Sequence, residues 1–94
     1  MKYFDWEEDK NEQLKREREI SFEDVVLTIE DNQLLDIVEH PNKKLYPNQK
    51  VFIINVNRYA YLVPFIEDEG KVFLKPIIPS RKATRKYLVE RKVK

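Results

Sequence analysis

The 94-residue chain contains no cysteine, one glycine and one histidine. The lack of cysteine excludes a disulfide framework and a thiolate zinc site, and one glycine is too few for a glycine-rich phosphate loop. No apolar run approaches the roughly 20 residues of a membrane-spanning helix, and the first residues lack the apolar segment of a secretory signal. From these absences and the length we expect a single domain, residues 1–94, in the cytoplasm and without membrane contact.

The single histidine, His40, limits the available catalytic chemistry. It is the one conventional imidazole acid or base, and a ribonuclease that uses two histidines is excluded. Its place before Pro41 puts it in an extended or loop segment, where a histidine is often simply a surface residue. Because carboxylates fall mainly on expected helix surfaces, we expect no metal site and no cofactor.

The net charge of +1 conceals a division of charge along the chain. Residues 1–40 carry 5 Lys/Arg and 13 Asp/Glu, a net charge of −8, whereas residues 41–94 carry 13 Lys/Arg and 4 Asp/Glu, a net charge of +9. This division favours one surface for a polyanion and another for a basic partner. The alternative is that the two halves neutralise each other within the fold.

Two helices are expected near the N-terminus. Asp5 and Glu8 have the spacing of a capping box, and Leu14 is the clearest apolar anchor of the helix that follows. Ser21 and Asp24 repeat the capping signal before an apolar stripe at positions i, i+3, i+4 and i+7, which should pack on a sheet. The predicted helices span residues 6–19 and 22–30.

The middle of the chain is predicted to form a sheet. Runs of β-branched and aromatic residues, separated by Pro, Asn and Gly, predict strands at residues 34–38, 51–56, 59–66 and 71–78. Pro64 and Pro76 cannot donate to a strand ladder, so each should lie at a bulge or on an outward edge. With a short helix from Ser80 to about residue 90, the expected class is α+β: two N-terminal helices, a four-stranded antiparallel sheet and a C-terminal helix. The helices should cover one face of that sheet.

The start of the C-terminal helix carries the strongest functional signal. Ser80 is a good N-cap, and Arg81 and Lys82 then fall in the first turn, where the helix dipole disfavours cations. Arg85 and Lys86 follow one turn later and extend two cationic rows. Fixed cations beside free helical N–H groups favour an anion, most naturally a phosphate. The alternative is a solvated basic helix end.

Aromatic residues and cations also alternate in the predicted sheet. Arg58 precedes Tyr59 and Tyr61, and Lys75 follows Phe73. An exposed tyrosine beside an arginine can stack on a base while the cation holds a phosphate, although such alternation more often reflects simple core packing. Lys75 should face an open, polar side of the sheet, since a lysine is rarely buried without a partner.

Motifs at both ends of the chain resemble a known family. The N-terminal residues FDWEEDKN (4–11), followed by LK (14–15) and ISFE (20–23), and the C-terminal residues IIPSRKATRKY (77–87) resemble the BrnT-type toxins of bacterial type II toxin–antitoxin systems. That family shows patterns close to F-x-W-D-x-x-K … L-x-x-H-G-V-S-F-E and I-I-S-A-R-K-A-T-x-x-E. The two motifs bracket nearly the whole chain.

The resemblance implies a RelE-like fold and a metal-independent endoribonuclease that inhibits translation. It also implies a cognate antitoxin of the ribbon-helix-helix type, through which the toxin would meet operator DNA indirectly. Arg81, Lys82 and Arg85 match the basic element of the family.

The expected catalytic residues are Arg81 and Arg85, which would stabilise the phosphoryl transition state, with His40, Tyr59 or Glu67 as acid or base. The residues expected to contact RNA are Lys82, Lys86, Arg58, Lys75 and Ser80.

The chain departs from the family pattern in two places. Glu17-Arg18-Glu19 replaces the His-Gly pair, and Pro76 stands where a strand-compatible residue, often Thr, is usual. We expect Pro76 to weaken the last strand and to lower toxicity. The alternatives are a non-catalytic module that binds RNA or the ribosome, and a module that binds a protein partner; either would be an inactive toxin.

Overall fold

A six-stranded mixed sheet forms the centre of the computed structural model, which describes residues 3–89. Its strands are β1 (Tyr3–Asp5), β2 (Leu34–Glu39), β3 (Gln49–Val56), β4 (Tyr59–Asp68), β5 (Lys71–Leu74) and β6 (Ile78–Pro79). They lie in the order β1-β5-β4-β3-β2, and β6 also pairs with β4. Only the pairing of β1 with β5 is parallel. The α+β class is confirmed, but the prediction of four antiparallel strands is wrong.

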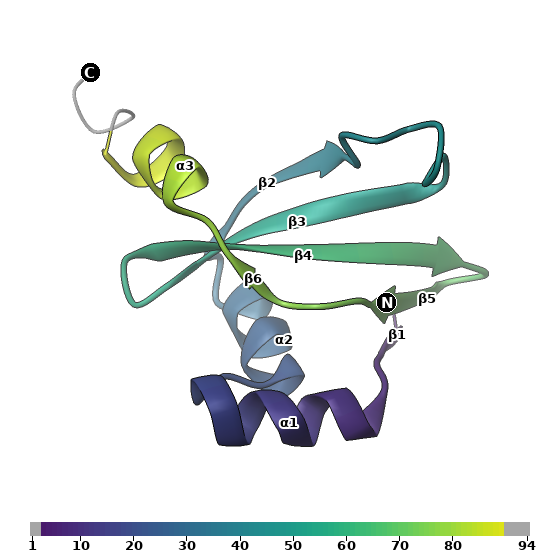
Figure 1. Ribbon diagram of the computed structural model, residues 1–94, viewed down its shortest axis with the longest axis horizontal. Coiled ribbons are helices and arrows are strands. Elements are labelled where there is room, and N and C mark those ends of the chain that lie inside the picture. The colour runs from purple at the N-terminus through teal and green to yellow at the C-terminus, as the bar shows by residue number, and fades with distance from the viewer. Residues whose placement is uncertain (1–2, 90–94) are drawn as a thin grey trace.

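Helices lie on both faces of this sheet (Figure 1). The helices α1 (Glu8–Arg18) and α2 (Phe22–Glu30) cover one face, and α3 (Arg81–Thr84) lies over the other. A π-helical turn, η1 (Arg85–Val89), continues α3, and the expected helix end at residue 90 lies outside the described residues. The expectation that helices cover a single face is therefore wrong. Within residues 3–89 no helix has the length and apolar character needed to cross a membrane.

The first helix begins later than the sequence suggests. Asp5 is the last residue of β1 and pairs with Phe73, so the chain is still extended at the predicted N-cap. The Asp5 carboxylate accepts a hydrogen bond from the N–H of Trp6 at 2.8 Å, and Glu7 takes the N-cap position without a side-chain cap. The predicted capping box between Asp5 and Glu8 is wrong because Asp5 belongs to β1 and the helix begins after Glu7.

The second helix follows its prediction residue for residue. The Ser21 hydroxyl accepts from the N–H of Asp24 at 3.2 Å, and the Asp24 carboxylate accepts from the N–H of Ser21 at 3.0 Å, which is a complete capping box. Phe22 and Val25 are fully buried against the sheet. The predicted apolar stripe is thus confirmed.

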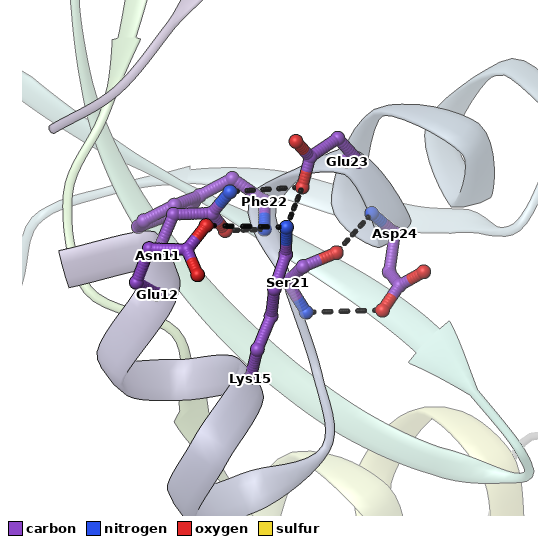
Figure 2. A network of polar contacts seen from close by, with 7 residues as sticks. All are labelled: Asn11, Glu12, Lys15, Ser21, Phe22, Glu23 and Asp24. Atoms are coloured by element: carbon purple, nitrogen blue, oxygen red, sulfur yellow. Dashed lines mark hydrogen bonds and ion pairs between the residues drawn. The ribbon is translucent and has the colours of Figure 1, made fainter. Parts of the chain in front are cut away.

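A buried asparagine joins α1 to the start of α2 (Figure 2). Asn11 is 0% exposed; its side-chain oxygen accepts from the N–H of Phe22 at 2.7 Å, and its amide donates to Glu23 at 2.9 Å. The Lys15 ammonium lies 3.8 Å from the same Glu23 oxygen. These contacts, the Asn11 hydrogen bond foremost, lower the pKa of the Glu23 carboxyl below its ordinary value of 4.5.

Two apolar clusters hold the sheet between the helices. The larger cluster lies on the α1–α2 face and includes Phe22, Phe52 and Phe65, with the Phe52 and Phe65 rings stacked at 3.9 Å. The smaller cluster lies under α3 and is built on Ile53, Ala60 and Ala83. Both faces of the central strands are therefore buried, one under α1 and α2 and the other under α3.

The two strand prolines meet at one bulge. Leu74 pairs with Phe65 and Ile78 pairs with Leu62, so three residues of the β5–β6 segment face two residues of β4. Within this bulge the N–H of Lys75 donates to the carbonyl of Pro64 at 2.7 Å. The backbone nitrogen of Pro64, which carries no hydrogen, faces the bulge. Pro76 lies inside the same bulge, so both expectations for the prolines are confirmed.

Candidate functional site

Hydrogen bonds pin the start of α3 to the first residues of β4. The Ser80 hydroxyl accepts from the N–H of Ala83 at 3.0 Å, which confirms the predicted N-cap. The N–H of Ser80 donates to the Ala60 carbonyl at 3.0 Å, and the Thr84 hydroxyl donates to the Ser80 carbonyl at 2.7 Å. The same hydroxyl accepts from the N–H of Ala60 at 2.8 Å. The helix is therefore held on the strand by the Ser80 backbone and the Thr84 hydroxyl, and its cations take no part in these contacts.

The cations of this helix point away from the sheet. Ala83 is buried, and Tyr87 packs against the same cluster, as their spacing predicts. The remaining long side chains are exposed and form one surface, here called the basic surface: Arg81, Lys82, Arg85 and Lys86. The predicted phosphate-binding residues are thus brought together by one helical segment.

The charges of the basic surface are not neutralised by any carboxylate among residues 3–89. None of its four side chains forms an ion pair with a described residue, whereas Lys43 pairs with Glu39 on the distant loop. The Lys86 ammonium lies 5.3 Å from the centre of the Tyr87 ring, a cation–π contact that leaves its charge available. Four cations within six residues, none paired with a carboxylate of residues 3–89, create a positive potential that attracts anions.

A phenol–carboxylate pair that the sequence did not reveal lies next to the basic surface. The Tyr87 hydroxyl donates to the Asp36 carboxylate at 2.6 Å, and both line a shallow pocket with Leu35 and Lys86. Such a pair can accept or release a proton. The two residues are 51 positions apart, so no local spacing indicates the contact.

His40 is not brought to the basic surface. Its backbone N–H donates to the carbonyl of Gln49, the first residue of β3, and its Nδ1 accepts from the N–H of Asn42 at 3.1 Å. Its ring centre lies 4.4 Å from that of Tyr46. The strand β4 holds α3 at Ala60, which pairs with Asn55 near the other end of β3. Six residues of strand, about 20 Å, separate the two ends.

Tyr59 also lies apart from the outward side of α3. Its neighbour Ala60 packs under α3, so the Tyr59 side chain lies on the opposite face of the sheet, with its ring centre 5.7 Å from that of Tyr61. Arg58 is exposed in the turn that precedes it, and Glu67 is exposed at the far end of β4. The predicted set of catalytic residues is therefore divided between three places.

Lys75 lies on the same face of the sheet as α3 but at a distance. Val72 and Leu74 belong to the larger cluster, so Phe73 points to the opposite face, where the Lys75 ammonium lies 5.4 Å from its ring centre. Lys75 is half-buried and bonds to Pro64, four residues along β4 from the attachment of α3, or about 13 Å. A nucleic acid bound along this face would span both places.

Neither a metal-binding cluster among residues 3–89 nor a similarity to known proteins indicates a function for the chain. Among residues 3–89 no three His, Cys, Asp or Glu side chains gather as a metal site would require. Comparison with protein-family models, with curated proteins and with solved structures found no match. The geometry and the two terminal motifs are therefore the basis for assigning a function.

Proposed function

We propose that the chain is an RNA-directed toxin that binds the RNA backbone through the basic surface and cleaves it without a metal. The observation that carries the proposal is the exposure of four cations on one helical segment, none paired with a carboxylate among the described residues. The terminal motifs, which resemble those of BrnT-type toxins and imply a RelE-like fold, support the same conclusion. A surface chosen for stability alone would carry acids in the first turn of α3.

Arginine is suited to the scissile phosphate because its guanidinium forms two parallel hydrogen bonds with phosphate oxygens. Arg81 and Arg85 lie one helical turn apart, so both can contact one phosphate or two neighbouring ones. Lys82 and Lys86 act as point charges that hold the flanking backbone. Ser80 contributes by capping the helix that presents these side chains.

The reaction is attack of a ribose 2′-oxygen on the adjacent phosphorus. The bond to the 5′-oxygen of the next nucleotide breaks, which leaves a 2′,3′-cyclic phosphate and a 5′-hydroxyl. A base takes the 2′-hydroxyl proton and an acid protonates the leaving oxygen. Arg81 and Arg85 stabilise the charge that develops on the phosphoryl oxygens, and loss of one such donor typically costs about 10²–10³-fold in rate. The Tyr87–Asp36 pair beside Lys86 is the acid–base pair that this geometry favours.

The test is incubation of the purified chain with 5′-labelled RNA in EDTA, beside Arg81→Ala/Arg85→Ala. The matched control is Lys44→Ala/Lys50→Ala, which removes two exposed cations near the His40 end of the sheet. We expect cyclic-phosphate products from the parent and the control but not from the arginine variant. Cleavage that disappears in EDTA, or that survives loss of both arginines, would overturn the proposal.

A non-catalytic protein that binds RNA or the ribosome is the second candidate. It is favoured by one observation, namely that His40 and Tyr59 lie away from the basic surface. This candidate predicts salt-sensitive RNA binding without products in the same assay.

The proposal includes a cytoplasmic location and a basic antitoxin of the ribbon-helix-helix type. The toxin would meet operator DNA only indirectly, through this antitoxin. The acidic first turn of α1, with Glu8 and Asp9 exposed, offers a surface of complementary charge.

A further inference from the structure

We propose that bound RNA continues from the basic surface onto Tyr59 and Tyr61, whose rings stack on its unpaired bases. This inference rests on the proposed function and deepens it, because it names the ligand class as single-stranded RNA. Two tyrosines between cations form the kind of stacking platform that binds single strands without reading their sequence.

The two rings are arranged so that they can receive a base. Tyr59 and Tyr61 project from the same side of β4, and both are partly exposed. Their ring centres lie 5.7 Å apart with planes inclined at 70°, an edge-to-face pair. In such a pair the two rings are not stacked face to face on each other, and Tyr61 also packs against the larger cluster.

The end of β4 lies between this platform, on one face of the sheet, and the basic surface, on the other face. Tyr61 pairs with Pro79 of β6, and the next hydrogen bond in line joins Ala60 to Ser80. Arg81, the first residue of α3, therefore follows at the Tyr59 end of the strand. A strand of RNA held by Arg81 needs only to pass around this sheet edge to reach the two rings.

Cations also flank the rings on the side away from α3. Arg18, in the last turn of α1, lines a groove with Tyr61, and Arg58 occupies the turn immediately before Tyr59. Neither arginine forms an ion pair with a described residue. The end of α1 that carries Arg18, the β3–β4 hairpin and α3 all lie toward the left of Figure 1. Phosphates on either side of a stacked base would thus meet an arginine.

The charges in the groove orient the nucleotide. Glu19 and Asp24 line the groove together with Arg18 and Tyr61. Carboxylates repel a phosphate but accept hydrogen bonds from the amino groups of bases. The base therefore faces the groove, and the phosphates follow the arginines at its rim.

The experiment compares the binding of two short single-stranded RNAs, one intact and one with abasic positions in its middle. Both are 2′-O-methylated, which blocks attack by the 2′-oxygen and keeps binding separate from cleavage. The proteins are the full chain, Tyr59→Leu, Tyr59→Phe and the control Tyr46→Leu, which removes an exposed ring near His40. Thermal unfolding of each variant checks that it folds.

We expect the parent to prefer the intact RNA by about 5- to 30-fold, the size of one or two stacked bases. Tyr59→Leu should lose most of this preference, while Tyr59→Phe and Tyr46→Leu should keep it. Equal binding of intact and abasic RNA by the parent would overturn this inference but leave the proposed function standing. No binding of either RNA by the parent would overturn both. The parent comparison needs no variant, so a misfolded Tyr59→Leu does not weaken the test.

Discussion

Replacing Asn11 by alanine should destabilise the fold more than almost any other polar substitution in α1. Asn11 is 0% exposed and accepts from the N–H of Phe22, itself a buried residue. Without the asparagine that N–H is buried and unsatisfied, which costs about 1–3 kcal/mol. The space left by the shortened side chain adds about 1 kcal/mol. We expect a total loss of about 2–4 kcal/mol of unfolding free energy.

The assay is thermal and chemical denaturation of Asn11→Ala beside the parent. For a chain of this length each kcal/mol corresponds to about 4–8 °C, so the melting temperature should fall by at least about 8 °C. The matched control is Gln13→Ala, two residues away on the exposed side of α1, where the amide donates to the Glu17 carboxylate. A melting temperature for Asn11→Ala equal to that of the control would refute the reasoning.

The same network gives a pH dependence of known sign. The pKa of Glu23 is lowered in the folded state, chiefly by the Asn11 amide, so its stabilising contribution is present above the unfolded pKa of about 4.5 and is lost as pH falls through the folded pKa. Asn11→Ala removes the largest cause of this lowering, while Lys15 and Ser21 remain. The difference in stability between the parent and Asn11→Ala should therefore narrow below pH 4.5. A difference that widens in acid would contradict the assignment.

Three further substitutions have expected outcomes. Asn57 and Arg58 both have positive φ, 53° and 68°, in the two-residue turn between β3 and β4. Arg58→Gly should therefore raise the unfolding free energy by about 0.5–1 kcal/mol, and a lower unfolding free energy would contradict a strained turn. Ser80→Ala removes the α3 cap and should lower stability by about 1 kcal/mol in denaturant titration, with Ser80→Gly milder; equal values would argue against the cap. Pro76→Thr gives the bulge a further N–H donor and should raise growth inhibition when the chain is expressed. Unchanged toxicity would contradict this expectation.

Elements set by short-range signals were predictable from the sequence. The capping box and stripe of α2 are local, and so are the Ser80 cap and the two-residue turn before β4. The strand β1 was missed because it has only three residues and pairs with β5, nearly seventy positions away, in parallel. Such a contact leaves no local pattern, and it also displaced the start of α1.

The position of α3 was missed although the sequence carries a signal for it. Residues 51–54 are all apolar and all buried, which indicates a strand covered on both faces rather than one. The alternation in β4 agrees, since Ala60 packs under α3 while Tyr61 packs toward the larger cluster. A sheet with one open face would not need apolar residues on both sides.

The candidate site, too, was predictable from the sequence only in part. The basic surface follows from the sequence because its four residues share one helical segment. The distance of His40 and the face occupied by Tyr59 depend on the strand register, which the sequence does not specify. The Tyr87–Asp36 contact depends further on where α3 crosses the sheet.

The salt dependence of RNA binding tests the central claim most directly. The measurement is the affinity for a 2′-O-methylated single strand over a range of salt concentrations, for the parent, Arg81→Ala/Arg85→Ala and Lys44→Ala/Lys50→Ala. If the basic surface holds the backbone, the arginine variant should show a slope of log affinity against log salt that is smaller by about 1.4, because each lost phosphate contact removes about 0.7. The lysine control should keep the parent slope. Equal slopes for the parent and the arginine variant would contradict an RNA site on α3.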